Sequence, residues 1–383
     1  MMKFSITKTH KFIILFILLS GIFVHPVNSQ TPDKKFQKIQ KYIDDATTNK
    51  LAGVVIYIKS VKYGNWIGTS GYSNLENKTP IKKEDVFSLA SIGKTYNAVA
   101  VLKLVEEDKI RLDDKIEKYL PKEIIEGIPN AKQVTVRHLL GHTSGFHNYN
   151  RHPILNELYL TGKLKLDTLS HINALRRYAY GVYPYTKPVG TYSYSSTNYL
   201  LLTMIMDSIL PEGHEAYLRK NIILKYGFSN TYYKQTPPKN LVNHYGDINK
   251  DNLIENLSAQ TIETTNWYSG DDGIYAPIEE ASDFLEKLMK GDILNKKMLK
   301  EMTTWNDEEN PDYGLGLMVG KESPFKLSIG HSGRGIGITT DLYYFPIQDM
   351  SIAIFCNTGL RSGTKAFYNT YNKMRKKIIR ELF

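Results

Sequence analysis

Cysteine is almost absent from this chain, which has a single one, Cys356, among 383 residues. One cysteine cannot form an internal disulfide, so packing alone must hold the core together. The surrounding SIAIFCNT predicts a buried strand, and we interpret Cys356 as a small hydrophobic residue rather than a nucleophile. Repeats, low-complexity tracts and a Pro/Gly-rich linker are also missing. About 350 residues can bury a substantial core, as one large domain or two.

Long apolar runs are also scarce, and the one from Phe12 to Val24 lies near the N-terminus behind a lysine-rich start. It is too short to span a bilayer comfortably. Val27-Asn28-Ser29 offers small residues at the usual cleavage positions, so we predict a secretory signal peptide over residues 1–29. The expected product, residues 30–383, is exported to the periplasm or the outside and has no integral membrane segment. An uncleaved anchor is the alternative, whereas the lack of a cysteine at the cut disfavours a lipoprotein.

Acidic residues are outnumbered, with 39 Asp and Glu against 49 Lys and Arg, and the net charge is +10. Cleavage after residue 29 would remove three lysines and no acid, leaving +7. Most of the lysines are scattered, as on a solvated surface. One basic cluster runs from Lys373 to Arg380 and could attract anionic polymers or lipids. No nucleic-acid motif accompanies it, so we expect no nucleic-acid partner.

Segments with strand character lie near both ends of the chain, and the middle, about 108–290, is mostly helical with long loops. Amphipathic helices are predicted at Pro32–Asn49 and Thr364–Phe383. The predicted strands are Leu51–Ser60, Tyr63–Tyr72, Gly314–Val319, Lys326–His331, Ile336–Phe345 and Ser351–Asn357. This order predicts an α/β (α+β) fold, with one sheet assembled from the two chain ends and a helical region inserted between them.

The stretch FSLASIGKTYNAVAVLKL, Phe87 to Leu104, places Ser91 and Lys94 three residues apart at the predicted start of an apolar helix. One interpretation is structural, because serine is a favoured N-cap and lysine an ordinary helix former. The other is chemical: Ser91 attacks a substrate and Lys94 takes its proton. The partial positive charge and free N–H groups of a helix N-terminus would stabilise a serine alkoxide.

A catalytic lysine needs a special environment, because an unperturbed lysine titrates near ~10.4 and is protonated at neutral pH. Burial and positive potential can produce a neutral amine that acts as a base. On a helix, position i+3 brings Lys94 against Ser91 without a loop to order.

The pattern S-x-x-K is weak by itself, since it occurs four times. The pairs are Ser5/Lys8, Ser91/Lys94, Ser323/Lys326 and Ser362/Lys365. The first falls in the signal peptide. The third contains a proline and runs into a strand, where positions i and i+3 face opposite sides. Almost no chain follows the fourth pair, so little sequence remains there to supply catalytic partners. Ser91 and Lys94 are therefore the candidates.

Three further stretches support the catalytic interpretation of Ser91 and Lys94: Val136–Phe146, Lys187–Leu202 and Ile329–Pro346. Together with the Ser91 stretch they resemble the serine β-lactamase and penicillin-binding-protein superfamily. The similarity is to the class C-like branch, which includes esterases, D-amino-peptidases and D,D-carboxypeptidases, and it runs from about Phe36 to near the C-terminus. It implies a β-lactamase/transpeptidase-like fold, an antiparallel sheet with helices on its faces.

The second motif of that superfamily is Y-x-N, and Tyr194-Ser195-Ser196 stands in its place. The resemblance implies that Tyr194 shares the serine proton and passes it to the leaving group. Ser196 replaces the asparagine, which puts the contact to a substrate amide in doubt. A second register, Ser196-Thr197-Asn198, fits the S-x-N of other members; we prefer Tyr194 because the flanking pattern fits that register.

The third motif, H-x-G in this branch, is matched by His331-Ser332-Gly333 on a predicted strand. The resemblance implies substrate binding by His331, Ser332, Gly333 and Arg334, with Ser196 across the pocket. It also implies an oxyanion hole made by the backbone N–H groups of Ser91 and Arg334. Gly330-His331-Ser332 also begins like the nucleophile elbow G-x-S-x-G of α/β-hydrolases. The pattern requires glycine where this chain has Arg334, so an α/β-hydrolase is disfavoured.

Two more family-like stretches, His142–Phe146 and Ser269–Pro277, are interpreted as loops that shape the site. His138, His142 and His147 have poor spacing for zinc and no nearby carboxylate, so we expect neither metal nor cofactor.

The sequence therefore predicts an exported serine hydrolase that works through an acyl-enzyme on an ester or amide. Candidate substrates are a D-amino peptide, a peptidoglycan-type peptide, a carboxyl ester or a β-lactam. The alternative is a penicillin-binding or receptor-like module that is acylated but turns over poorly. Nothing in the sequence indicates the oligomeric state.

Overall fold

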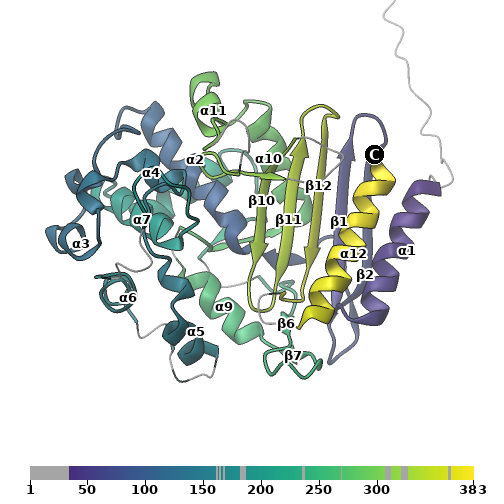
Figure 1. Ribbon diagram of the computed structural model, residues 1–383. Helices are drawn as coiled ribbons and strands as arrows, with labels where there is room; N and C mark the ends of the chain where they lie inside the picture. The colour runs from purple at the N-terminus through teal and green to yellow at the C-terminus, as the bar shows by residue number, and fades with distance from the viewer. Residues whose placement is uncertain are drawn as a thin grey trace, which may run out of the picture.

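A seven-stranded sheet forms the centre of the computed structural model, and it combines strands from both ends of the chain (Figure 1). The structure describes residues 34–160, 163, 165–166, 169–181, 187–234, 238–268, 270–306, 312–320, 327–360 and 364–383. The strand order is β3-β2-β1-β12-β11-β10-β9, and every neighbouring pair is antiparallel. The strands are β1 Gly53–Ser60, β2 Gly64–Asn74, β3 Thr79–Pro80, β9 Met318–Gly320, β10 Ser328–Arg334, β11 Thr339–Phe345 and β12 Met350–Cys356. The predicted sheet, built from the two chain ends, is confirmed.

The two terminal helices, α1 (Lys34–Asn49) and α12 (Lys365–Leu382), lie side by side on one face of this sheet (Figure 1). Alternation along β1 explains how both faces are filled: Val54, Ile56 and Ile58 pack under these helices. Val55 and Tyr57 point to the opposite face and join the larger core. A strand buried on both faces reads as a continuous apolar run, as β1 and β12 do.

Helices cover the opposite face and continue beyond the edge of the sheet (Figure 1). They are α2 Gly93–Glu106, α3 Lys122–Gly127, α4 Val136–Leu140, α5 Pro153–Leu160, α6 His171–Tyr178, α7 Ser196–Ile209, α8 Gly213–Leu218, α9 Ser258–Trp267, α10 Ile278–Met289 and α11 Lys296–Met302. Short strands interrupt this predicted helical region. Strand β8 Ile274–Pro277 pairs with β4 Val86–Ser88 on one side and with β5 Tyr232–Tyr233 on the other, and β6 Tyr245–Gly246 pairs with β7 Glu255–Asn256. The middle is therefore helical with short strands rather than purely helical.

Most other sequence expectations agree with the structure to within a few residues. Strand β9 is shorter than predicted, because Gly316 adopts a positive φ of 89° and turns the chain just before it. Cys356 is a buried free thiol in β12. The predicted signal peptide, Ser323 and Ser362 lie outside the described residues. Among the helices that the structure describes, none combines the length and apolar character needed to cross a bilayer.

Candidate active site

Ser91 lies in a single 3₁₀ turn, Ala90–Ile92, between β4 and α2. The sequence predicted a helix start at Ser91, but α2 begins two residues later, at Gly93. Ala90 holds a φ of 49°, which is uncommon for a residue with a side chain. A Cβ atom on Gly93 would lie 2.7 Å from the Asp272 carbonyl oxygen, so glycine lets the 271–273 loop approach the helix start.

Lys94 is fully buried on the first turn of α2, and its Nζ donates a hydrogen bond of 3.1 Å to Ser91 Oγ. The same Nζ donates to the Asp271 carbonyl oxygen at 3.1 Å and lies 3.7 Å from the Asp271 carboxylate. A heavy-atom separation near ~3 Å is what a general base needs to exchange a proton with a serine hydroxyl. The predicted pairing of Ser91 with Lys94 is therefore present in the fold.

Behind Lys94 lies an acidic pair that the sequence reading did not single out, Asp271 and Asp272. Burial, together with the neighbouring Asp271, raises the pKa of Asp272 to about 7. Asn150 donates to Asp271 Oδ2 at 3.3 Å and to Ser196 Oγ at 2.9 Å, so it connects this pair to the second motif. Asn150 is 46 residues from Ser196 and 121 from Asp271, and no local pattern marks it.

Tyr194 lies just before α7, and its ring centroid is 5.1 Å from Lys94 Nζ. His142 supports it from behind, with ring centroids 4.2 Å apart. The His142 carbonyl accepts from Ser193 N at 2.8 Å, and its Nδ1 accepts from Ser195 N at 3.2 Å. Burial holds the pKa of His142 well below its usual range, which keeps the ring a neutral acceptor. The loop that begins at His142 thus positions Tyr194.

The two registers of the second motif differ in what faces the cavity beside Ser91. That cavity, about 670 Å³ in volume, is lined by Tyr194 and Ser196. Asn198, required by the S-x-N register, is fully buried and accepts a hydrogen bond of 2.6 Å from Ser144. Its amide nitrogen lies 3.1 Å from His142 Nδ1. Asn198 therefore braces the His142 loop and does not line the cavity.

The third motif lies on β10, as predicted, but its members differ in exposure. Ser332 and Arg334 line the cavity of Ser91. The His331 ring is 1% exposed and does not line it; its Nε2 lies 3.0 Å from the Tyr313 hydroxyl and its Nδ1 lies 2.8 Å from the Ser332 carbonyl. Burial lowers the pKa of His331 to about 3. The imidazole is thus a neutral part of the wall behind Tyr194.

Gly333 permits close approach between β10 and the Ser91 turn. A Cβ atom there would lie 2.3 Å from the Leu89 carbonyl oxygen and 2.2 Å from Thr340 Oγ1. Only glycine fits this contact without moving backbone. Its place in the motif therefore has a packing reason, and the side chain of any other residue would separate the strand from the nucleophile.

Arg334 is held at the end of β10 by several acceptors. Its Nη1 donates to the carbonyls of Gly333 and Thr340, both at 2.8 Å, and its Nη2 donates to Asp341 Oδ1 at 2.8 Å. The buried Asp341 carboxylate also accepts from Ser332 Oγ and Tyr371. This network fixes the cationic wall of the cavity.

Among the described residues, no three His, Cys, Asp or Glu side chains gather closely enough to hold a metal ion. What the arrangement offers is a serine hydroxyl beside a lysine amino group, with a tyrosine ring nearby at the same cavity. These groups suit acyl transfer.

Comparisons with known proteins agree with this geometry. The family described as Beta-lactamase matches residues 38–372. Penicillin-binding protein 4* of Bacillus subtilis (strain 168) is 26% identical over 295 residues, which are 70% of this chain and 60% of that protein. Protein flp of Staphylococcus aureus (strain N315) is 26% identical over 206 residues, 53% of this chain and 39% of that protein. The chain thus spans less than two thirds of the length of these relatives.

Solved structures show the same fold. A D-stereospecific amidohydrolase from Streptomyces sp. superposes with a TM-score of 0.72 at 24% identity, covering 84% of this chain and 94% of that one. The D-amino acid amidase from Ochrobactrum anthropi SV3 superposes with a TM-score of 0.75 at 19% identity, covering 91% and 99%. Since the family match covers most of the chain and includes all three motifs, this protein belongs to the β-lactamase family.

Proposed function

We propose that this protein is an exported serine hydrolase that acts on an ester or amide through an acyl-enzyme. The observation that carries the proposal is the 3.1 Å contact between Ser91 Oγ and Lys94 Nζ at a cavity that Tyr194 also lines. Export rests on the sequence of residues 1–29, which lies outside the described residues.

In the proposed reaction, Ser91 Oγ attacks the substrate carbonyl carbon while its proton moves to the Lys94 amino group. The N–H groups of Ser91 and Arg334 stabilise the oxyanion. Tyr194 gives its hydroxyl proton to the leaving oxygen or nitrogen as the bond to carbon breaks, and Lys94 passes the serine proton on to Tyr194. Water then attacks the acyl-enzyme, gives one proton to the same groups, and releases the acid and the Ser91 hydroxyl.

The names of structural neighbours support an amide or ester as substrate. One neighbour is named a D-stereospecific amidohydrolase and another a D-amino acid amidase. A third is described as a hydrolase with promiscuous acyltransferase activity, EstCE1. We propose D-amino amides or peptides, including peptidoglycan-type peptides, and small carboxyl esters as the substrate classes to test first.

Asn150 supplies an amide near the position where the second motif lacks its asparagine. Its Nδ2 reaches Ser196 Oγ, and its side chain lines the same cavity as Ser91. We infer that Asn150 takes over the contact with the substrate amide that Ser196 cannot make.

The test is hydrolysis of p-nitrophenyl acetate and a panel of D-amino amides by the purified protein, with Ser91→Ala as the control. We expect hydrolysis that disappears in the variant, together with covalent fluorophosphonate labelling of the wild type only. Labelling that survives in Ser91→Ala would contradict the assignment of the nucleophile.

A second candidate is a penicillin-binding module that is acylated and turns over poorly, which the relatives named penicillin-binding proteins favour. The hydrolase and the penicillin-binding module differ in the time course of product release. A module gives one equivalent of released product and then stops, whereas a hydrolase continues at a steady rate after any initial burst.

We expect penicillins and cephalosporins to be poor substrates. Many family members use a lysine where His331 stands, and this imidazole is buried and neutral. Arg334 lines the cavity, but Asp341 and two carbonyls already occupy its guanidinium. Values of kcat/KM for β-lactams, esters and amides, measured on one preparation, check this; a cephalosporin that exceeds every ester and amide would contradict it.

A further inference from the structure

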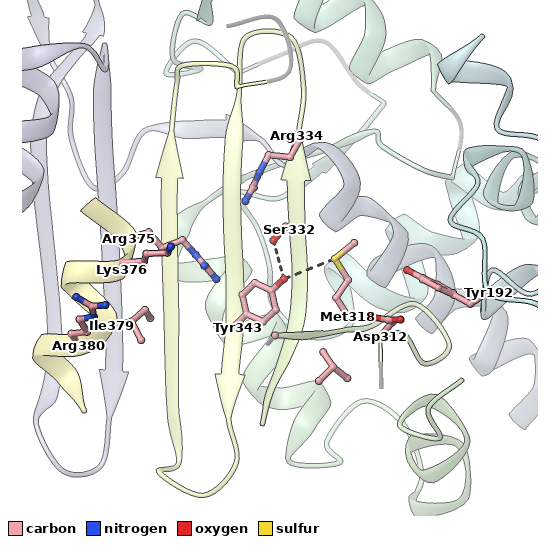
Figure 2. A pocket seen from close by; sticks show the side chains of 12 residues that line it. Tyr192, Asp312, Met318, Ser332, Arg334, Tyr343, Arg375, Lys376, Ile379 and Arg380 are labelled. Atoms are coloured by element: carbon pink, nitrogen blue, oxygen red, sulfur yellow. Dashed lines mark hydrogen bonds between the residues drawn. The ribbon is translucent and has the colours of Figure 1, made fainter. Parts of the chain in front are cut away.

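A second cavity, about 650 Å³ in volume, adjoins the one at Ser91 (Figure 2). The two share Tyr192, Met318, Ser332 and Arg334, so they form one continuous cleft. The Tyr343 hydroxyl lies 2.8 Å from Ser332 Oγ and 3.9 Å from the Met318 sulfur, as the dashed lines in Figure 2 show. A substrate that reaches Ser91 can therefore extend along β10 toward α12.

Helix α12 lines the far side of this second cavity with Arg375, Lys376, Ile379 and Arg380 (Figure 2). With Arg334, the lining includes four cationic side chains and one carboxylate, Asp312. These α12 residues come from the basic cluster at the C-terminus that the chemistry at Ser91 does not use.

A buried carboxylate fixes two of the four cations. Asp341 accepts from Arg334 Nη2 at 2.8 Å and from Arg375 Nε at 2.9 Å, so both guanidinium groups contact the same carboxylate. The shared carboxylate holds both arginines in set positions, which limits the entropy lost when an anion binds.

The other two cations stand at the exposed mouth. Lys376 and Arg380 are one helical turn apart, at positions i and i+4, where like charges repel. Within the described part of the chain, neither side chain has a carboxylate within 4 Å. An anion between them would relieve this repulsion and gain two charge-assisted contacts.

We propose that this second cavity is a subsite for an anionic group, a carboxylate or a phosphate, that the substrate carries several bonds away from its scissile carbonyl. The inference rests on the proposed hydrolase function and specifies its substrate class. Ile379, Met318 and Tyr343 provide apolar surface for the connecting chain. A substrate group is favoured over a membrane surface because the cations line a hollow that leads to the nucleophile.

The experiment compares matched esters in pairs. Mono-p-nitrophenyl esters of dicarboxylic acids of increasing length are measured against the same esters with the free carboxyl capped as a methyl ester. A second arm replaces the carboxylate by a phosphate, which separates the two sources of charge. We expect a kcat/KM preference for the anionic partner at one or more lengths, and its loss as salt concentration rises.

The variant Lys376→Gln/Arg380→Gln should lower kcat/KM for the preferred anionic ester about three- to tenfold and leave the neutral ester unchanged, as expected for two partly exposed contacts. Lys373→Gln/Lys377→Gln is the matched control. It removes two positive charges from the same helix, but these side chains line a different cavity, between α12 and α1, and the Lys377 ammonium lies 5.0 Å from the Tyr42 ring centroid. This control should behave as wild type toward both esters.

The outcomes separate the two proposals. If neither the neutral nor the anionic esters are hydrolysed, or if Ser91→Ala hydrolyses them equally well, the hydrolase proposal is overturned and this one with it. Hydrolysis that requires Ser91 but shows no anionic preference at any length, or a preference that the double variant retains, would overturn only the subsite. Binding to phosphatidylglycerol vesicles that the double variant loses, without any substrate preference, would identify the cluster as a membrane contact and also overturn it.

Discussion

At the scale of single residues, the proposed chemistry depends on three side chains with different environments. Ser91 lies in a strained turn, Lys94 is fully buried, and the Tyr194 ring packs against the neutral ring of His142. The Tyr194 hydroxyl is buried and has no hydrogen-bond partner among the described residues. A buried hydroxyl without a partner is costly, and such groups are often found where function needs them.

Tyr194→Phe removes this hydroxyl and keeps the ring that packs on His142. We expect the variant to lose about 10²- to 10⁴-fold in kcat, since a positioned proton carrier typically contributes that much. Its melting temperature should not fall, because no described residue hydrogen-bonds the hydroxyl. Steady-state ester assays measure kcat, and thermal unfolding of the same samples measures the melting temperature.

Ser196→Ala is the companion variant, and it decides between the two registers of the second motif. Ser196 accepts from Asn150 and lines the cavity, so we expect a modest loss compared with Tyr194→Phe. An inactive Ser196→Ala beside a nearly normal Tyr194→Phe would instead assign proton transfer to Ser196.

At the scale of elements, the site depends on how closely β10 approaches the turn that carries Ser91. Gly333 allows the approach, and Thr340 of β11 adds a hydrogen bond of 2.9 Å to the Leu89 carbonyl. The nucleophile and the proposed oxyanion-hole strand are thus held together by backbone contacts, not only by the side chains that perform the chemistry.

Gly333→Ala should disturb this contact, because its methyl group would lie 2.3 Å from the Leu89 carbonyl oxygen. We expect a loss of about 1–3 kcal/mol in the free energy of unfolding, the usual range for overpacking, and a drop in kcat larger than any change in KM. Denaturant titration and ester kinetics measure the two effects.

Gly141→Ala is the matched control for that substitution. Gly141 has a φ of −91°, and a Cβ atom there would have its nearest contact at 3.4 Å, which is ordinary van der Waals distance. Its stability and kcat should stay close to wild type. Equal losses in the two variants would show that the approach of β10 is not what matters.

At the scale of the whole molecule, several ionisable groups are buried away from solvent. Burial lowers the pKa of His244 and of His331 to about 3, and it holds the pKa of His142 well below its usual range. The pKa of Asp272 shifts in the opposite direction, since burial raises it to about 7. Proton uptake on unfolding should therefore make stability depend on pH.

Whether the free energy of unfolding rises or falls with pH depends on which state, folded or unfolded, binds more protons. Below pH ~6.5 the unfolded histidines bind protons and the folded ones do not, so each histidine lowers stability as pH falls from ~6.5 toward its folded pKa, which is about 3 for His244 and His331. Folded Asp272 holds a proton that the unfolded residue releases, so its contribution is present below pH ~4 and is lost as pH rises through about 7. Between pH ~6.5 and ~5, His244 and His331 each lower the free energy of unfolding by about 1.5 kcal/mol, and Asp272 raises it by a similar amount.

We therefore expect these three groups to lower the free energy of unfolding by about 1.5 kcal/mol between pH ~6.5 and ~5, and the lowered pKa of His142 acts in the same direction. Urea titrations at the two pH values measure this difference. His331→Gln should reduce the difference and Asp272→Asn should increase it. A difference that neither variant changes would mean that these groups titrate alike in the folded and unfolded states.

Much of the fold follows from the sequence alone. Short continuous apolar runs in Val54–Ile58 and Ile352–Cys356 predict strands, and the spacing in Thr364–Phe383 predicts the last helix. These patterns are local, so each can be interpreted within about ten residues. The contact between Ser91 and Lys94 is also local, because the 3₁₀ turn of Ser91 runs directly into the first turn of α2 and residues three apart meet there.

Only the tertiary structure decided which other groups join them. Lys94 meets Asp271 across 177 residues, and Asn150 meets Ser196 across 46, so no local period could reveal either contact. The interior position of His331 and the packing reason for Gly333 also depend on what lies across from them in space. The sequence by itself determined most of the secondary structure and the contact between Ser91 and Lys94, since both follow from short-range geometry. The wall of the cleft, including the cations of α12, was decided by the folded chain, because burial and charge balance depend on contacts between distant segments.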